Sequence, residues 1–560
     1  MPEDRLIDEV RDAVIGDDEA IATPFGLRRV TYADYTASGR SLSFIEDFIR
    51  ETVLPLYANT HTESSGTGLQ TTRFREDARA IIRDAVGATP DDHAVIFCGS
   101  GSTGAIDKLI DCLELRLPAG LDERYGLESQ IPDRDRPVVF IGPYEHHSNE
   151  LPWRESIAEL VRVPEDHDGR IDLDALEGAL IEHAERPVKI GSFSAASNVT
   201  GIISDVSAIS ALLHRHDALS FWDYAAAAPY VAIEMTPRDG DALGYLDAVF
   251  ISPHKFVGGP GTPGVLVARR DLFHNPVPSV PGGGTVAYVN PTEHRYLDDI
   301  ERREEGGTPA IVESIRAGLV FQLKEAVGVE AIREREEAFT HTAMHRWEAN
   351  PNIEILGNHD LPRLSIVSFV VRHRDRYLHH NFVVALLNDL FGIQSRGGCS
   401  CAGPYGHRLL GIDLERSRGF EREIARGCEG IKPGWVRVSF NYFLTQAVFE
   451  YVLDAVDLAA TDGWRLLPRY RFDPPSGTWR HVDGQPEPPM SLRDVRYEDG
   501  HMRFEGHRHH EPGSRLADHL AEARVLLAEP PAAAEEQALD VGGDFEDLRW
   551  FWLPQEVAAG

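Results

Sequence analysis

The amino-acid sequence predicts an α/β fold class built around a mostly parallel sheet. Between about residues 30 and 300, short apolar segments alternate with segments of helical pattern, as in sheets that carry helices on both faces. Polar or glycine-rich residues directly follow most of the apolar segments. Because ligands of such sheets bind at the carboxyl ends of the strands, we expect the functional residues at these positions.

Six apolar segments in this range are predicted to be strands. They are rich in β-branched and aromatic residues and shorter than most helices. The predicted strands are 94–97, 137–141, 188–193, 219–222, 248–251 and 265–268, and the helices between them include 105–115, 173–184 and 206–216.

A smaller α+β region and a C-terminal extension follow. A long helical run reaches about residue 350, and strands are predicted at 365–371 and 436–440. Ser514 is expected to cap a helix, and the aromatic segment 547–554 is expected to dock onto the body of the protein or onto a partner subunit. We therefore divide the chain into an N-terminal segment (1–29), a large α/β domain (30–310), a small α+β domain with an N-terminal connecting helix (311–464) and the extension (465–560).

The charge of the chain is strongly negative. It has 56 basic and 90 acidic side chains, a formal net charge of −34, and such a surface repels nucleic acid and anionic membrane. No apolar run approaches the ~18 residues that span a bilayer, and the acidic N-terminal sequence contains no apolar signal segment. The five cysteines are sparse and odd in number, so a disulfide framework is not expected. We therefore expect a cytoplasmic protein with neither nucleic acid nor membrane as a partner.

Lys255 gives the most specific functional signal. It follows a predicted strand in the sequence Ser252-Pro-His254-Lys255 and precedes a glycine-rich turn at 258–264. A lysine at such a strand end can form a Schiff base, and the neighbouring hydroxyl, imidazole and backbone N–H groups can bind a phosphate. Taken alone, the motif favours an exposed lysine beside a hairpin turn, and the functional interpretation depends on the rest of the chain.

Four other strand ends carry complementary groups. Glycines and hydroxyls at 99–104 open a helix whose first N–H groups can bind an anion. Residues 144–149 include an imidazole that could stack on a flat cofactor, and Asn198 offers an amide to a ring oxygen. Asp223 ends an apolar strand, where a buried carboxylate needs a cationic partner such as a protonated pyridinium nitrogen. Together the five strand ends predict a site for pyridoxal 5′-phosphate (PLP).

With these motifs the sequence resembles the class V aminotransferases of PLP fold-type I, most closely the cysteine desulfurase and selenocysteine lyase branch. The resemblance covers roughly residues 30–460 and implies a large PLP-binding α/β domain with a smaller α+β domain. The matching stretches are Tyr32–Ala37, Tyr57–His61, Glu145–Asn149 with Pro152-Trp153, Ser197-Asn198, Asp223, Ser252–Lys255, Gly282–Gly284 and Glu305–Pro309.

The resemblance implies a role for each cofactor residue. Lys255 would be the Schiff-base lysine, Asp223 the partner of the pyridine nitrogen and His146 the ring that stacks on the cofactor. Asn198 would contact the ring hydroxyl oxygen. The remaining residues would hold the phosphate, and they are Ser102, Thr103, Ser252 and His254.

The resemblance also implies a substrate and a sulfur acceptor. Arg437 resembles the arginine that binds the substrate α-carboxylate, which suits a planar guanidinium, and His61 and Arg396 are expected to contribute to substrate binding. The loop 396–404 places Cys401 at the sulfur-accepting position, where a thiolate could attack an activated sulfur. The implied reaction converts L-cysteine to L-alanine with a persulfide on Cys401, in a homodimer that could pass sulfur to an acceptor protein.

Two alternatives to desulfuration stay open at this stage. The chain could be another class V PLP enzyme (selenocysteine lyase, epimerase or aminotransferase) in which Cys401 is not catalytic. It could also be a catalytically silent scaffold, although the set of Asp223, Lys255 and Arg437 argues against silence. Metal binding is not expected, because the Cys399-x-Cys401 pair has no second pair at a spacing suited to zinc.

Overall fold

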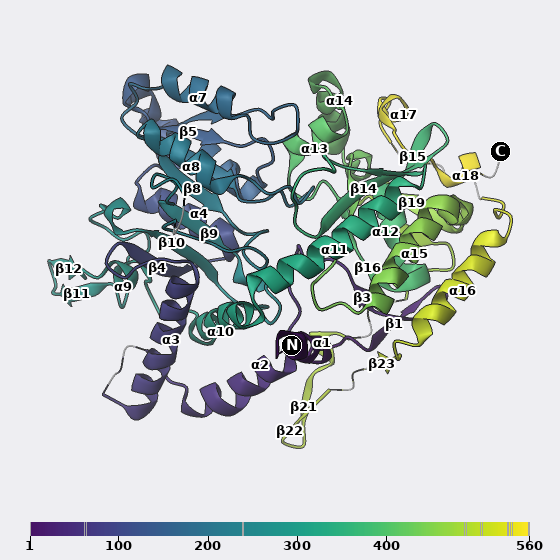
Figure 1. Cartoon of the computed structure of the whole chain (residues 1–560), viewed down its shortest axis with the longest axis horizontal. Coiled ribbons are helices and arrows are strands. Elements are labelled where there is room, and N and C mark those ends of the chain that lie inside the picture. Colours follow the sequence, from purple (N-terminus) through teal and green to yellow (C-terminus); the bar gives the residue numbers. More distant parts are fainter. Residues whose placement is uncertain are drawn as a thin grey trace. The chain divides into compact units, whose positions relative to one another are not determined.

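The computed structural model describes residues 2–557 apart from 61, 63, 238–239, 487, 489, 505, 507, 535–536, 538 and 540. The chain forms two compact units (Figure 1). Unit 1 contains residues 1–15, 35–337 and 358–364, and unit 2 contains residues 16–34, 338–357 and 365–560. The N-terminal residues and the C-terminal extension are therefore parts of these two units rather than separate bodies.

A seven-stranded sheet forms the centre of unit 1. Its strands lie in the order β4-β10-β9-β8-β7-β5-β6, and β10 is the strand that runs antiparallel to both of its neighbours. All six predicted strands of this domain are present, so the mostly parallel α/β sheet is confirmed. The strands are β4 (His93–Cys98), β5 (Val138–Ile141), β6 (Glu159–Arg162), β7 (Lys189–Ser194), β8 (Leu219–Asp223), β9 (Ala248–Ile251) and β10 (Gly264–Arg269).

Helices cover the sheet of unit 1 because its central strands are apolar on both faces. The predicted helices are present as α4 (Gly101–Cys112), α7 (Leu173–Glu182) and α8 (Val206–Arg215). Asp172 and Asp205 cap the N-termini of α7 and α8 through their side chains. Sequence patterning missed β6, an edge strand whose Glu-Leu-Val-Arg sequence is only partly buried.

The outer edge of β4 is closed by carboxylates rather than by another strand. Glu301 accepts a hydrogen bond from the N–H of Val95 (2.9 Å), and Glu305 accepts one from the N–H of Phe97 (2.7 Å). Glu305 also pairs with the buried Arg79, which keeps its charge compensated. These contacts fix the end of β4 just before the glycine-rich turn at 99–104.

The other elements of unit 1 include most of a long helical run whose last part lies in unit 2. The long helical run predicted up to residue 350 is two helices, α10 (Ile311–Val327) and α11 (Val329–Glu348), because Gly328 adopts φ +88°. The remaining elements include α1 (Pro2–Asp12), α2 (Ser43–Phe48), α3 (Gly66–Ala85), α5 (Ala119–Tyr125), α6 (Leu151–Arg154), α9 (Ile300–Glu304), β11 (Val286–Val289) and β12 (His294–Tyr296).

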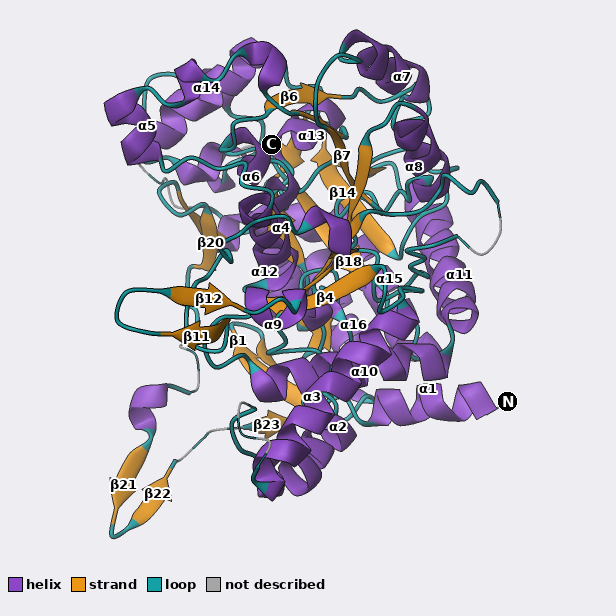
Figure 2. Cartoon of the chain, turned by 90° about the vertical axis from the view of Figure 1, so that its left-hand side faces the viewer, coloured by secondary structure: helices purple, strands orange, loops and turns teal. Residues whose placement is uncertain are grey.

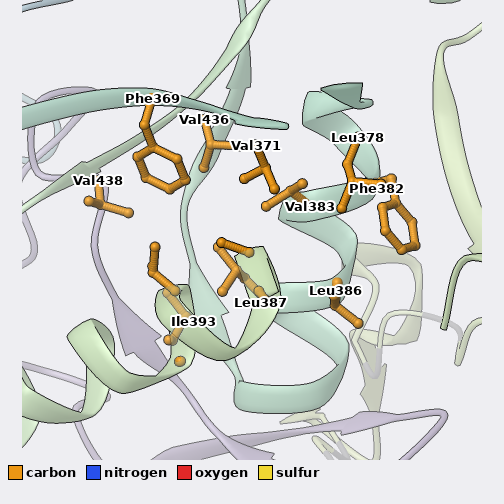
Figure 3. Close-up of a cluster of buried hydrophobic side chains, with 14 of the residues drawn as sticks. Phe369, Val371, Leu378, Phe382, Val383, Leu386, Leu387, Ile393, Val436 and Val438 are labelled. Carbon is orange, nitrogen blue, oxygen red and sulfur yellow. The ribbon is translucent and has the colours of Figure 1, made fainter. Parts of the chain in front are cut away.

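A second sheet forms the core of unit 2. Its order is β13-β14-β18-β17, with β15 also paired to β14, and the two strands predicted from the sequence are β14 (Ile366–His373) and β18 (Trp435–Ser439). Helix α12 (His380–Phe391) packs its apolar face against the sheet, and Figure 3 shows Phe382, Val383 and Leu387 among the side chains of this cluster. The other elements here are β13 (Ile353–Ile355), β15 (Arg376–Leu378), β16 (Ile393–Gln394), β17 (Arg396–Gly398), α13 (Gly403–Leu409), α14 (Leu414–Ala425) and α15 (Gln446–Asp462).

The C-terminal extension packs into the same unit. Trp550 stacks on His380 with a centroid distance of 5.6 Å, and Phe551 is fully buried, so the predicted docking of segment 547–554 is confirmed within the chain. Ser514 precedes α16 (Arg515–Ala528) but makes no capping hydrogen bond, so its predicted capping role is wrong.

The remaining strands and helices of unit 2 come from both ends of the chain. They are β1 (Glu19–Thr23), β2 (Gly26–Arg29), β3 (Thr31–Tyr32), β19 (Tyr470–Asp473), β20 (Thr478–His481), β21 (Arg496–Glu498), β22 (His501–Arg503), β23 (His509–His510), α17 (Phe545–Leu548) and α18 (Pro554–Val557).

None of the described helices has both the length and the apolar character needed to cross a membrane. Within the same described residues, no group of three or more His, Cys, Asp or Glu side chains is arranged to hold a metal ion.

Candidate functional site

The carboxyl ends of β4 and β9 meet through a hydrogen bond in unit 1. The N–H of Ser102, in the first turn of α4, donates to Oγ of Ser252 at 2.8 Å. Lys255 lies three residues after Ser252, in a short 3-10 turn (Pro253–Lys255), and its side chain is half-buried. The predicted phosphate-binding serines and the predicted Schiff-base lysine therefore belong to one local structure.

The N-terminus of α4 is shaped as a cradle. Its N-cap residue, Ser100, makes no side-chain capping bond, so the first N–H groups of the helix are not consumed by a cap. Gly101 adopts φ +56°, and a Cβ there would lie 2.7 Å from Oγ of Ser252. A Cβ on Gly264 would lie 2.0 Å from the carbonyl oxygen of Gly101. Glycine is required at both positions, which lets the backbone and the hydroxyls approach a common point.

A chain of hydroxyl and imidazole groups adjoins this cradle. Thr103 Oγ1 is 2.7 Å from Ser148 Oγ, which is 3.0 Å from Nδ1 of His146. Nδ1 of His146 also accepts the backbone N–H of Ser148 at 3.1 Å. The neutral His146 ring therefore carries its proton on Nε2, and its orientation is fixed by Ser148. Ser148 was not predicted as a site residue, although it lies in the matching stretch 145–149.

Asp223 is a buried carboxylate at the end of β8, with 5% of its surface exposed. Burial raises its pKa, while the N–H of Ala225 (2.9 Å), the charge of Lys255 and the hydroxyl of Ser102 act in the opposite direction. Asp223 thus lies in the electrostatic field of Lys255, as expected for a carboxylate with a cationic neighbour.

His254 is held in its neutral form. Burial, with a smaller contribution from the charge of Lys255, lowers the pKa of His254 to about 4. Its Nδ1 lies 3.4 Å from Oγ of Ser38, and its backbone oxygen accepts from Gly39 N–H at 2.8 Å. A Cβ at Gly39 would lie 1.9 Å from the carbonyl oxygen of Phe256, so this segment must approach without a side chain. Sequence reasoning missed the segment because it follows none of the predicted strands.

Glu145 organises a second buried network beside Asp223. Its carboxylate accepts from Ser194 N–H (3.0 Å), Ser194 Oγ (2.6 Å) and Asn149 Nδ2 (2.7 Å). Burial raises the pKa of Glu145 to about 7, and the negative charge of Asp223 contributes in the same direction. Ser194 lies opposite Asp223 in the β7–β8 register, so Glu145 connects the His146 loop to the strand end that carries Asp223. The sequence placed Glu145 in a motif but gave no sign of this role.

Asn198 lies in the loop that follows β7 in unit 1, and 8% of its surface is exposed. The preceding residue, Ser197, accepts the N–H groups of Val199 and Thr200 at 3.1 Å each, which shapes the backbone around Asn198.

Unit 2 contains the predicted carboxylate-binding arginine. Arg437 is 3% exposed on β18, and its guanidinium donates to Oδ1 of Asp34 at 2.7 Å. Arg396 on β17 is its direct cross-strand partner. Burial lowers the pKa of Arg437, and the neighbouring Arg396 acts in the same direction whereas Asp34 opposes it. Two cross-strand arginines and one aspartate therefore lie together at this position.

Cys401 lies in a strained turn of unit 2. Ser400 and Cys401 have φ angles of +49° and +55°, and the N–H of Ala402 donates to the carbonyl oxygen of Cys399 at 3.1 Å. Left-handed backbone costs a residue with a Cβ roughly 1–2 kcal/mol, and such strain is found at functional sites. Both Cys399 and Cys401 are half-buried, free thiols.

The predicted site residues thus fall into two groups. Unit 1 brings together seven of them around the ends of the sheet strands, namely Ser102, Thr103, His146, Asp223, Ser252, His254 and Lys255. Asn198 belongs to the same unit, and Arg396, Arg437 and Cys401 belong to unit 2. His61, predicted to contribute to substrate binding, lies outside the described residues.

The comparisons with known proteins agree on one family. The family model described as "Aminotransferase class-V" matches residues 31–452. A probable cysteine desulfurase of Staphylococcus epidermidis is 28% identical over 400 residues, which cover 70% of this chain and 88% of that protein. A probable cysteine desulfurase of Staphylococcus aureus is 27% identical over 385 residues, with 67% and 84% covered.

Solved structures share the fold. A cysteine desulfurase of Thermococcus onnurineus superposes with a TM-score of 0.61 at 23% identity, covering 77% of this chain and 94% of the other. The cysteine desulfurase of Escherichia coli gives a TM-score of 0.58 at 20% identity, covering 76% and 94%. The fold of this chain is therefore that of PLP fold-type I proteins, as the sequence predicted.

Proposed function

Because the chain belongs to the class V aminotransferase family, we propose that it is a PLP-dependent enzyme acting on an amino acid, and specifically a cysteine desulfurase. The observation that carries the cofactor assignment is the assembly of Ser102, Ser252, His254 and Lys255 around one strand end, with Asp223 in the field of the lysine. The names of the similar proteins support the finer assignment.

The residues present fit PLP. The cradle at Gly101 brings helix N–H groups and the Ser252 hydroxyl to one point, where a phosphate would be held together with Ser102, Thr103 and the neutral His254. Asp223 would accept a hydrogen bond from the protonated pyridine nitrogen and keep that nitrogen protonated, and His146 would stack on the ring in the orientation set by Ser148. Lys255 would hold the cofactor covalently through Nζ. When bound, PLP supplies an electron sink for bond cleavage at the substrate Cα.

The chain's own groups would then do three things. Arg437 would bind the substrate α-carboxylate through its guanidinium. Arg396 and His61 would contribute to substrate binding. Lys255 Nζ would carry a proton to and from the substrate Cα. Cys401 Sγ would attack the substrate sulfur as a thiolate, so that an S–S bond forms while the Cβ–S bond of the substrate breaks. The electron pair of the broken bond would stay with the carbon fragment, which is protonated to alanine, and Cys401 would carry the sulfur as a persulfide. In the second candidate, another class V reaction, Cys401 has no part. The residues before it, Gly398-Cys399-Ser400, support this candidate, because the resembled family usually has histidines or bulkier groups there.

We further propose a cytoplasmic homodimer that passes sulfur to an acceptor protein. The dimer follows from the family resemblance, in which the stretch matching 282–285 reaches the phosphate of the partner subunit. The strongly acidic surface, with a net charge of −34, supports neither nucleic acid nor anionic membrane as a partner.

The test is release of sulfide and alanine from L-cysteine by the purified protein in the presence of a thiol reductant, which reduces the persulfide and frees its outer sulfur as sulfide. A parallel screen of other amino acids follows changes in the cofactor absorption. Equal amounts of sulfide and alanine from cysteine are expected. Spectral changes with other amino acids, together with no sulfide from cysteine, would establish the alternative class V reaction.

A further inference from the structure

Residues 490–504 of the C-terminal extension form a separate hairpin, which we call the arm. Among the described strands, β21 and β22 pair with each other alone. Asp499 and Gly500 connect them with φ angles of +52° and +77°, as a two-residue type I′ turn requires. Figure 2 shows the hairpin extending away from the other strands of unit 2. The arm also lies outside the family match at 31–452.

One face of the arm is apolar and exposed. Tyr497 lies directly opposite Met502 in the register, and these side chains are 80% and 61% exposed. Phe504 continues the same face at 45% exposure, and Leu492, at the base of the arm, is 91% exposed. A two-stranded hairpin is at best marginally stable alone in water, and clustered exposed apolar side chains mark interaction sites. The apolar face is therefore suited to being covered by a protein surface.

The opposite face carries a like-charged pair. Arg496 is the direct cross-strand partner of Arg503, an arrangement that destabilises a hairpin unless an anion compensates it. The carboxylate of Glu498 is 3.9 Å from Arg496, at the outer limit of an ion pair, and both side chains are mostly exposed. The pair is thus placed to bind carboxylates from outside the arm.

The charge of the chain indicates what supplies these carboxylates. The arm contains three arginines and three acidic residues and is neutral, so the net charge of −34 resides on the rest of the chain. That charge repels nucleic acid and anionic membranes, whereas a second copy offers acidic surface at equal concentration. We propose that the arm docks on a second copy of this chain, with Tyr497 and Met502 against its apolar surface and Arg496 and Arg503 against its carboxylates. In a two-fold dimer the contact is made twice.

The first test is photo-crosslinking of the full-length protein with p-benzoylphenylalanine in place of Tyr497. Unlabelled and ¹⁵N-labelled chains are mixed and left to exchange before irradiation. Crosslinked peptides of mixed isotope composition are expected, because they arise between two copies. Crosslinks confined to single chains, or none above a sample with the probe at the exposed Leu121 of unit 1, would overturn the proposal.

The second test measures self-association by sedimentation over a concentration series. We expect Tyr497→Ser with Met502→Ser, and separately Arg496→Glu with Arg503→Glu, to weaken the dimer by about tenfold or more. The controls are Leu414→Ser and Val525→Ser, which change side chains 67% and 68% exposed on helices of the same unit. Arm variants that associate as tightly as these controls, or a wild-type chain that stays monomeric, contradict the proposal. Neither measurement uses enzyme activity, so both results are independent of whether the proposed reaction is correct.

Discussion

The N–H of Ser102 donates a 2.8 Å hydrogen bond to Oγ of Ser252, and this bond joins two strand ends that are 150 residues apart in the sequence. One partner begins α4 and the other begins the turn that carries Lys255. The position of the lysine therefore depends on the same contact that shapes the proposed phosphate-binding cradle. Cofactor binding and covalent attachment should be coupled through this pair.

We expect Lys255→Ala to abolish the covalent attachment of PLP. The wild type should yield a borohydride-trapped adduct on Lys255, found by peptide mass spectrometry, and the variant should yield none. Lys432→Ala, which changes a half-exposed lysine of unit 2, is the control and should keep the adduct. An adduct on another lysine in the wild type would contradict the assignment.

Asp223→Asn is expected to keep the fold and lose most turnover. A neutral amide cannot hold the ring nitrogen protonated, and removal of one preorganised electrostatic group at an active site costs about 10²–10³-fold in rate. The measurement compares kcat and the cofactor absorption spectrum with those of the wild type. The control is Asp389→Asn, which changes a buried aspartate of unit 2 and should alter stability but not the cofactor spectrum. A near-normal rate in Asp223→Asn would make this residue structural.

Glu145→Gln should flatten the dependence of stability on pH. The carboxyl has a pKa of about 7 in the folded protein and an ordinary value of 4.5 when unfolded, so the folded state holds its proton more tightly. The contribution of this group to the free energy of unfolding is therefore present below about pH 4.5 and is lost as the pH rises through 7. The expected loss is about 2–3 kcal/mol, and it should be absent in the variant. Urea unfolding at pH 5, 6 and 7.5 measures how the free energy of unfolding changes with pH. Equal pH dependence in the wild type and in Glu145→Gln would contradict the raised pKa of Glu145.

The sequence predicted the strand ends well because those signals are local. An apolar run followed by Asp223, or by Ser252 and Lys255, is visible in a short window, and the parallel topology brings such ends to one edge of the sheet. The partners of these residues could not be predicted in the same way. Ser38 contacts His254 across 216 positions and Asp34 contacts Arg437 across 403, so only the folded chain identifies them.

Other differences have local physical causes. Gly328 divides the predicted long helix because its φ of +88° is incompatible with a continuous α-helix. Serine often caps helices, but a capping residue needs a non-helical backbone. Ser514 has helical angles (φ −62°, ψ −22°), and its side chain makes no capping hydrogen bond. The arm was not predicted, because its strands are only three residues long and its alternation is brief.

Arg437→Lys should raise the KM for the amino-acid substrate by about 10–100-fold, since hydrogen bonds to charged groups contribute about 1.5–3 kcal/mol. Lysine keeps the charge but cannot offer two parallel donors to a carboxylate. The ion pair with Asp34 can persist, so the thermal midpoint should change little. Steady-state kinetics with the proposed substrate, L-cysteine, measure the effect. Arg372→Lys, an exposed β14 arginine paired with Glu354, is the matched control, and an equal KM for the two variants would exclude carboxylate binding by Arg437.

The proposed desulfuration assigns the sulfur-accepting role to Cys401. If its thiolate accepts sulfur, a persulfide should accumulate there when cysteine is supplied without reductant, and intact-mass and peptide mass spectrometry detect the added 32 Da of one sulfur atom. Cys401→Ala should lower sulfide release by at least about 10²-fold, the loss typical of removing a catalytic group, while the cofactor spectrum stays unchanged.

Cys399→Ala is the matched control, because both thiols are free and half-buried in the same turn. It should be the milder change, although Cys399 can react with a persulfide on Cys401 to form a disulfide and release sulfide. Comparison of Cys401→Ala with the double variant Cys399→Ala/Cys401→Ala shows whether Cys399 can accept sulfur directly or only reacts with a persulfide on Cys401. Full activity of both single variants and of the double variant on cysteine would remove desulfuration through this loop. The strained backbone at Ser400 and Cys401 would then need a structural explanation. Another class V reaction would replace desulfuration as the proposed function.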